Sequence, residues 1–193
     1  MDKQLILASA SPRRADILKQ IGLQFIIRAS DFDEGQFDRS VTPPEMVMSL
    51  ALQKAQKVAE SVREGLIIGA DTVVVIEGEI LGKPSSGAEA VTMLSRLNGK
   101  EHSVFTGVAL VEVPHGRSVS SFVETRVQFR SLEISEIETY VSTGEPLDKA
   151  GGYGIQGKGA ILVEKIDGCY FNVVGLPVAK LVTMLKDFGV PVG

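Results

Sequence analysis

The chain has 193 residues, 44% of them hydrophobic, and a formal net charge of −4. This length allows one large domain or two small lobes, and the mixed charges exclude the broad basic field that nonspecific nucleic-acid binding requires. Its single cysteine, Cys169, excludes an internal disulfide and favours a reducing, cytoplasmic setting. No apolar run approaches the ~20 residues of a membrane-spanning helix, and the N-terminus lacks the pattern of a signal peptide.

Residues 5–22 have the pattern of a short buried strand, a tight turn and a helix. Ser11 suits the N-cap of that helix, and Pro12 suits its first position because proline loses no hydrogen bond there. An apolar stripe follows, and Gly22 is placed to end the helix. The segment therefore predicts a strand–turn–helix unit near the start of the chain.

Two arginines, Arg13 and Arg14, stand in the first turn of this helix. The helix dipole favours acids at that end, so cations are unfavourable there on their own. Both side chains could be solvated surface charges. Alternatively, two guanidinium groups beside free backbone N–H groups form an anion site that suits phosphate, and the occurrence of a pair favours this interpretation.

Hydrophobic periodicity and turn residues predict the remaining elements. Helices are expected over residues 43–62, 86–97, 131–141 and 178–188, and strands over residues 25–29, 66–68, 73–76, 80–81, 104–113, 119–129 and 161–166. Residues 168–171, around Cys169, also look like a strand. Some strands are joined by hairpins and others across helices, so the pattern predicts an α/β protein with a mixed sheet.

Lys54 lies on the apolar stripe of the predicted helix over residues 43–62. Residues spaced three, four and seven positions apart lie on one face of a helix, and Lys54 keeps this spacing. A lysine in such a place either extends along the apolar surface to reach water or faces a polar cleft. The pattern favours the cleft.

Asp71 interrupts residues 66–76, the most apolar β-rich stretch of the chain. A carboxylate among apolar side chains is costly unless it is paired, hydrogen-bonded or bound to a metal. Asp71 could tie down a turn, but an acid at the end of an apolar strand is also where active sites form in α/β proteins. Lys83 follows the next predicted hairpin and can point back toward the same strand end.

Residues 151–159 form a glycine-rich loop that resembles two phosphate-binding motifs. Both motifs require a helix after the loop, whereas a strand is predicted here, so both are rejected. The segment is either a plain structural loop or a backbone that wraps a ligand closely. In the second case Asp148, Lys149 and Gln156 are its polar candidates, and the Gln156 amide could read a base edge.

Taken together, these segments resemble the Maf family of nucleoside triphosphate pyrophosphatases. The matching pieces occur in order along nearly the whole chain: LASASPRR at 7–14, Glu34, Lys54 followed by Ala55, GADT at 69–72, GKP at 82–84, EPLDKAGGYGIQG at 145–157 and VGLP at 174–177. The resemblance implies a single domain over residues 1–193, with an elongated central mixed β-sheet flanked by helices. It also implies two lobes around a cleft and the general fold of inosine triphosphate pyrophosphatases.

The resemblance further implies hydrolysis of a nucleoside triphosphate to the monophosphate and pyrophosphate. Asp71 matches the family's general base, which activates the water that attacks the α-phosphorus. Glu34 is expected to bind metal with Asp71 or to orient the water. Carboxylate and phosphate oxygens suit Mg²⁺ or Mn²⁺, so a divalent cation is the expected cofactor.

The substrate carries several negative charges, which cations must neutralise. By the same resemblance, Lys54 and Lys83 belong to the catalytic set together with Asp71 and Glu34. Ser9, Arg13 and Arg14 are assigned to substrate binding.

Three positions place the chain in one subgroup of the family. Arg13, Thr72 and Gln156 match the group that acts on dTTP and UTP, whereas a sister group resembling 7-methyl-GTP pyrophosphatases has Trp, Gln and Glu there. The resemblance therefore implies a house-cleaning activity on dTTP, UTP or modified pyrimidine nucleotides.

The family has also been tied to the arrest of cell division and septum formation. The alternative is therefore a nucleotide-binding regulator with incidental turnover. A binding module needs a cationic cradle but no base, so Asp71 and Glu34 favour the enzyme. We expect a cytoplasmic protein whose partner is a nucleoside triphosphate and not nucleic acid or a membrane, and the family suggests a homodimer.

Overall fold

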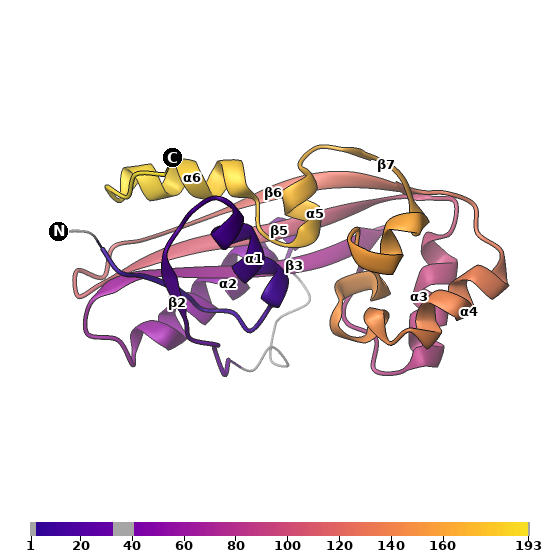
Figure 1. Ribbon diagram of the computed structural model, residues 1–193, viewed down its shortest axis with the longest axis horizontal. Coiled ribbons are helices and arrows are strands. Elements are labelled where there is room, and N and C mark those ends of the chain that lie inside the picture. Colours follow the sequence, from indigo (N-terminus) through magenta and orange to yellow (C-terminus); the bar gives the residue numbers. More distant parts are fainter. Residues whose placement is uncertain (1–2, 33–40, 193) are drawn as a thin grey trace. The chain divides into compact units, whose positions relative to one another are not determined.

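The computed structural model describes residues 3–32 and 41–192 (Figure 1). Strands are β1 (Leu5–Leu7), β2 (Phe25–Ile27), β3 (Gly65–Ile76), β4 (Glu79–Leu81), β5 (Glu101–Val113), β6 (Ser118–Phe129) and β7 (Val163–Asp167). Helices are α1 (Pro12–Gln20), α2 (Pro43–Ala59), α3 (Gly87–Leu97), α4 (Ile134–Ser142), α5 (Tyr170–Val174) and α6 (Val178–Asp187). Short 3-10 helices are η2 (Glu145–Asp148), η3 (Ala150–Gly152) and η4 (Gly157–Leu162).

Within the described residues the strands form one seven-stranded sheet in the order β2-β1-β3-β5-β6-β7, with β4 paired to β3. Strand β1 pairs in parallel with β2 and β3. The pairs β3–β4 and β6–β7 are antiparallel. The predicted α/β class with a central mixed sheet and flanking helices is therefore confirmed. None of the helices in the described ranges is long and apolar enough to cross a membrane.

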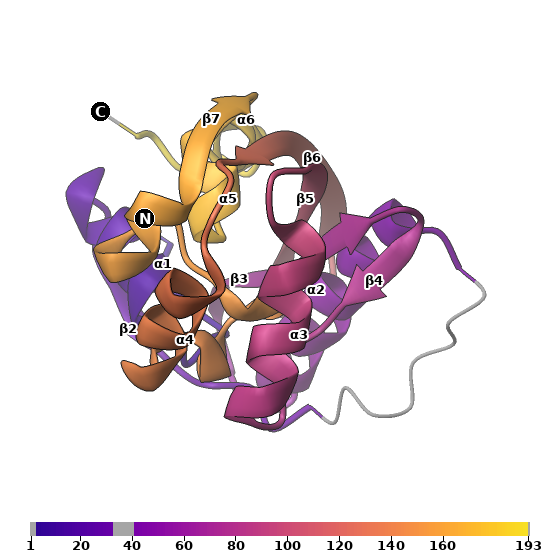
Figure 2. The same ribbon diagram turned by 90° about the vertical axis from the view of Figure 1, so that its right-hand side faces the viewer.

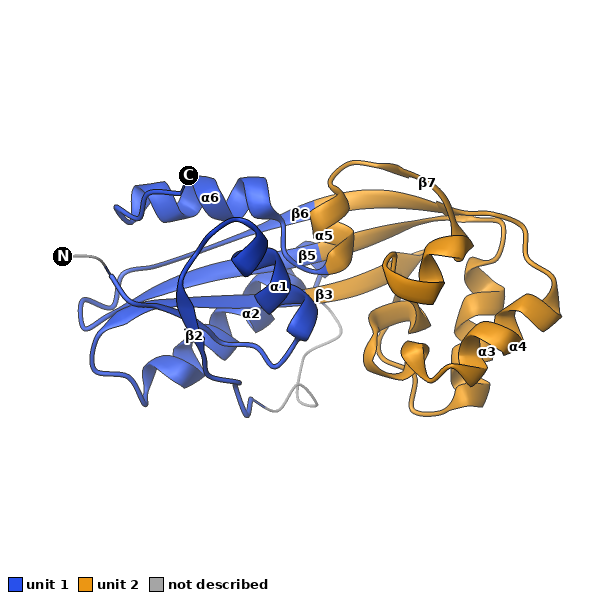
Figure 3. Cartoon of the chain, in the orientation of Figure 1, with its two compact units in different colours: residues 1–71, 106–123, 175–193 blue, residues 72–105, 124–174 orange. Residues whose placement is uncertain are grey.

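The chain divides into two compact units (Figure 3). Unit 1 comprises residues 1–71, 106–123 and 175–193, and unit 2 comprises residues 72–105 and 124–174. The chain passes from the first unit to the second between Asp71 and Thr72, inside strand β3.

In unit 1, helix α2 lies directly on the sheet because two glycines let the backbones meet. A Cβ atom added to Gly69 of β3 would lie 2.1 Å from the Ala51 carbonyl oxygen. One added to Gly107 of β5 would lie 2.1 Å from the Val47 carbonyl oxygen. A small apolar core also lies in this unit, formed by residues of α2 and of the sheet strands and their ends: Ile6, Ala8, Ala55, Val58, Ile67 and Val111.

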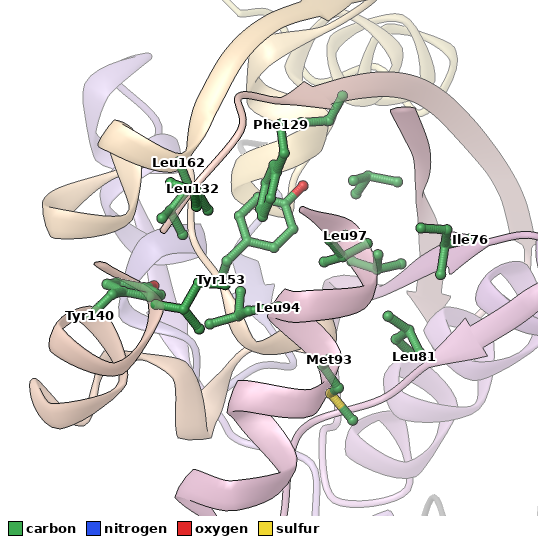
Figure 4. Packing of buried hydrophobic residues seen from close by; sticks show 14 residues of the cluster. Ile76, Leu81, Met93, Leu94, Leu97, Phe129, Leu132, Tyr140, Tyr153 and Leu162 are labelled. Carbon is green, nitrogen blue, oxygen red and sulfur yellow. The ribbon is translucent and has the colours of Figure 1, made fainter. Parts of the chain in front are cut away.

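Unit 2 has its own, larger core, which packs helices α3 and α4 against the sheet. These two helices lie side by side (Figure 1 and Figure 2). Figure 4 shows the buried cluster, with Leu94 and Leu97 from α3 facing Phe129, Tyr153 and Leu162. Because Tyr153 belongs to the glycine-rich segment, that segment is anchored in the core rather than lying loosely on the surface.

Two predictions about the strands were wrong. Residues 66–68 and 73–76 belong to one continuous strand, β3, so Asp71 lies within a strand and not at its end. Residues 69 and 70 are Gly and Ala, and the extended backbone continues through both of them. Residues 168–171 do not form a strand: Gly168 has φ +132°, and the Cys169 carbonyl accepts hydrogen bonds from the first turn of α5.

Candidate functional site

The turn between β1 and α1 is organised by the Ser9 side chain. Ser11 is the N-cap residue of α1, as predicted, with Pro12 in the first turn, but the Ser11 side chain makes no capping hydrogen bond. Instead the Ser11 backbone N–H donates to Ser9 Oγ at 3.2 Å, and Arg14 Nη1 donates to the same oxygen at 3.1 Å. Ser9 is buried, so its hydroxyl links the turn to the arginine from inside the protein.

Arg14 is also held from a distant part of the chain. Its Nε donates to the Gly175 carbonyl oxygen at 2.8 Å, across 161 sequence positions. The guanidinium is planar and donates in fixed directions, so two such bonds set its orientation. Arg14 is therefore a positioned cation, and the alternative of a freely solvated charge does not hold for it. Arg13, its neighbour in the first turn of α1, is half-buried.

Lys54 and Asp71 form an ion pair in the interior of unit 1. Lys54 Nζ lies 2.6 Å from Asp71 Oδ1, and the two side chains are only 12% and 9% exposed. Helix α2 supplies the lysine and β3 supplies the carboxylate, and the close approach at Gly69 brings these elements together. Lys54 thus faces a polar partner, and the two charges offset each other's cost of burial.

In unit 2 the glycine-rich segment meets the turn that carries Lys83. The Gly151 N–H donates to the Gly82 carbonyl oxygen at 2.9 Å, and a Cβ atom on Gly152 would lie 3.8 Å from the Pro84 ring. Gly151 has φ +67°, in the left-handed region that glycine tolerates best. The side chain of Lys83 itself is exposed.

Two of the residues assigned to base choice also lie in unit 2. Thr72 follows Asp71 along β3 and is half-buried, and Gln156 is an exposed residue within the glycine-rich segment. Strand β7 begins at Val163, after short 3-10 turns, so no α-helix follows the loop. The rejection of both phosphate-binding motifs is therefore confirmed.

The structure thus joins Ser9 to Arg14, Lys54 to Asp71, and the Lys83 turn to the glycine-rich segment. Glu34 lies outside the described residues. Within the residues described, no group of three or more His, Cys, Asp and Glu side chains is placed to hold a metal ion. Asp71 alone offers one carboxylate, which fits Mg²⁺ or Mn²⁺ only where other oxygens, such as phosphates and water, complete the coordination.

Two residues contribute to these segments in a way that the sequence does not predict. Gly175 belongs to the VGLP motif at 174–177, and its carbonyl oxygen accepts the hydrogen bond that fixes Arg14. His102 is buried and its Nε2 lies 2.7 Å from Tyr153 Oη. Both contacts join segments far apart in sequence, which local patterns do not reveal.

Comparison with known proteins gives one consistent family. The family model described as Maf-like protein matches residues 4–188. The dTTP/UTP pyrophosphatase of Dictyoglomus turgidum is 51% identical over 98% of this chain and 98% of its own length. That of Moorella thermoacetica is 52% identical over 98% and 97%. The chain therefore belongs to the Maf family.

Among solved structures, the Staphylococcus aureus Ham1 protein is similar with a TM-score of 0.49 and 15% identity. The likeness covers 83% of this chain and 80% of that one.

Proposed function

We propose that this chain is a nucleoside triphosphate pyrophosphatase that hydrolyses dTTP and UTP to the monophosphate and pyrophosphate. The observation that carries the proposal is the buried pair of Lys54 and Asp71, 2.6 Å apart. A carboxylate held beside a cation in the protein interior is a candidate for proton transfer. Relatives named dTTP/UTP pyrophosphatase at 51% and 52% identity support the same reaction and the same substrates.

Phosphate binding is assigned to the cations near the start of α1. Arg14 is oriented by Ser9 and Gly175, and Arg13 stands beside it in the same helical turn. No acid occupies the first turn of α1. Because a helix N-terminus and guanidinium groups both favour anions, this end of α1 suits a triphosphate. Lys83 is assigned to the same substrate.

The chemical step is assigned to Asp71. Its carboxylate accepts a proton from a water molecule while the water oxygen bonds to the α-phosphorus. The bond from the α-phosphorus to the oxygen that leads to the β-phosphorus breaks, and pyrophosphate leaves with that oxygen. Lys54 holds the carboxylate in place through the 2.6 Å contact.

A divalent cation is part of the proposal. Asp71 and Glu34 would hold it together with oxygens of the substrate. Mg²⁺ in phosphate-handling sites is bound in this way, through one or two carboxylates and the substrate phosphates. When bound, the ion would neutralise part of the negative charge on the substrate phosphates.

The test is a panel of nucleoside triphosphates incubated with the purified protein and scored separately for pyrophosphate and orthophosphate. Pyrophosphate is expected from dTTP and UTP, and excess chelator should abolish it. Orthophosphate as the first product, or full activity in excess chelator, contradicts the mechanism. Tight binding of dTTP without any turnover would favour the nucleotide-binding regulator instead.

A further inference from the structure

Gln156 stands in a short loop whose two ends touch. A Cβ atom on Gly159 would lie 2.2 Å from the Gly154 carbonyl oxygen, so the backbone at residue 159 lies against the backbone at residue 154. The same Cβ atom would lie 2.8 Å from Tyr140 Oη. Only glycine fits this crossing, which closes residues 154–159 into a loop that presents the exposed Gln156.

Two side chains from outside the loop bind its backbone on either side of Gln156. The Gly154 N–H donates to Tyr140 Oη at 3.3 Å. The Lys158 N–H donates to Glu145 Oε1 at 3.3 Å. These two amides lie at equal sequence distances before and after Gln156, so the hydroxyl and the carboxylate hold both arms of the loop.

Tyr140 and Glu145, the two anchors of the loop, are themselves held in place. Tyr140 is 2% exposed and belongs to α4. Glu145 begins η2, and its carbonyl oxygen accepts a hydrogen bond from Lys149 Nζ at 2.6 Å. The Lys149 chain then packs on the loop, because a Cβ atom on Gly154 would lie 2.9 Å from Lys149 Cε.

A glycine-rich loop without such anchors would sample many backbone conformations. Ordering it upon binding costs free energy, whereas a loop that is already held in place costs little. An amide that reads a base edge needs a fixed position, since a buried polar group that misses its partner is penalised. Tyr140 and Glu145 should therefore affect which base is bound, in addition to the stability of the loop.

We propose that Tyr140 and Glu145 are positioning residues for Gln156, and that they set the preference for a thymine or uracil base. The proposal rests on the function proposed above, because it assumes that Gln156 contacts the base. Neither residue touches the substrate in this account. They act by holding the loop in the conformation in which the Gln156 amide meets the base.

The test compares Tyr140→Phe and Glu145→Ala with the matched control Tyr170→Phe, whose tyrosine is 41% exposed. Loss of one hydrogen bond should raise KM for dTTP roughly 3–10-fold in both anchor variants, with kcat little changed. Glu145→Gln keeps an oxygen that accepts from the Lys158 N–H, so it should restore most of the wild-type KM. Inhibition by inorganic tripolyphosphate, which has no base, should stay at the wild-type level in every variant.

A double-mutant cycle separates positioning from general stability. On a Gln156→Ala background, Tyr140→Phe should leave the ratio of kcat/KM for dTTP and CTP unchanged, because the group being positioned is gone. The proposal is overturned if the anchor variants keep the wild-type ratio, or if they lower it equally with and without Gln156. If the wild-type protein releases no pyrophosphate, the proposed function fails, and the same ratios are then measured as dissociation constants for dTTP and CTP.

Discussion

Lys54 Nζ and Asp71 Oδ1 lie 2.6 Å apart and join helix α2 to strand β3 inside unit 1. The lysine is one of few polar groups on the inner face of its helix, whose buried residues are Val47, Leu50, Ala51, Ala55 and Val58. Removal of either partner leaves the other charge without its counter-charge in the protein interior, where little water can solvate it. An informative substitution therefore keeps the size of the side chain and removes only its charge or its hydrogen-bonding geometry.

Asp71→Asn keeps the shape of the side chain and removes the group that accepts a proton. We expect kcat to fall by about 10²–10⁴-fold, the usual contribution of a general base. Circular dichroism and the thermal midpoint show whether the fold is kept. The control is Asp16→Asn, which alters an exposed aspartate of α1 that pairs with Lys19 at 3.3 Å. Near-normal turnover in folded Asp71→Asn removes Asp71 from the catalytic role.

Arg14→Lys keeps the charge and removes the planar guanidinium. A single ammonium cannot reproduce the directed bonds to Ser9 Oγ and the Gly175 carbonyl oxygen while also facing a phosphate. A hydrogen bond to a charged group is worth about 1.5–3 kcal/mol, so KM for dTTP should rise roughly 10-fold or more. Arg28→Lys, at an exposed arginine near Ser61, is the control. Equal KM values in the two variants would refute a substrate role for Arg14.

Base choice is tested by exchanging three residues for those of the sister group: Arg13→Trp, Thr72→Gln and Gln156→Glu. A neutral amide can donate to a uracil or thymine carbonyl, whereas an ionised carboxylate can only accept. The triple variant should therefore lower the ratio of kcat/KM for dTTP over 7-methyl-GTP. An unchanged ratio with activity retained would mean that other residues determine the specificity.

A buried histidine should make stability depend on pH. Burial lowers the pKa of His102 from 6.5 to about 4. Between these values the unfolded chain binds a proton that the folded chain does not, so the free energy of unfolding falls as the pH falls. When the pH is lowered from about 7 to about 5, the free energy of unfolding should fall by about 2 kcal/mol more in the wild type than in His102→Gln.

Urea unfolding at the two pH values measures this difference. His115→Gln, at an exposed histidine of the β5–β6 hairpin, should behave like the wild type. The carboxylates whose pKa is lowered, Glu112 beside Lys3 among them, lose their contribution as the pH falls below their ordinary pKa of 4.5, which lies outside the interval from about pH 7 to about pH 5. A pH dependence that His102→Gln leaves intact would show that another group is responsible.

Local chemistry explains which parts of the fold could be predicted. Helix α2 begins at Pro43, where the pattern predicted its start, and a capping box stands at that end, with the Thr42 N–H donating to Glu45 Oε2 at 3.0 Å. Helical periodicity alone placed Lys54 on the inner face of α2. In both cases the interacting groups lie within a few turns of one helix, so the sequence spacing carries the geometry.

Contacts between distant segments were beyond the reach of such patterns. Nothing near Arg14 indicates that residue 175 will hold its guanidinium, and nothing near Gln156 indicates that Tyr140 will bind its loop. Strand β3 runs continuously through Asp71 and lies between β1 and β5 in the sheet, and local patterns do not reveal such pairing. The roles in catalysis and binding stay predictions from the family resemblance for every site residue: Ser9, Arg13, Arg14, Glu34, Lys54, Asp71, Thr72, Lys83 and Gln156.

The phosphorus atom that water attacks distinguishes a pyrophosphatase of this kind from other triphosphate hydrolases. Hydrolysis of dTTP is carried out in water labelled with ¹⁸O, the products are separated, and mass spectrometry determines which product carries the label. We expect attack at the α-phosphorus, which puts the label into the monophosphate and leaves the pyrophosphate unlabelled. Label in pyrophosphate or in orthophosphate would mean attack at the β- or γ-phosphorus, and would contradict a pyrophosphatase mechanism built on Asp71.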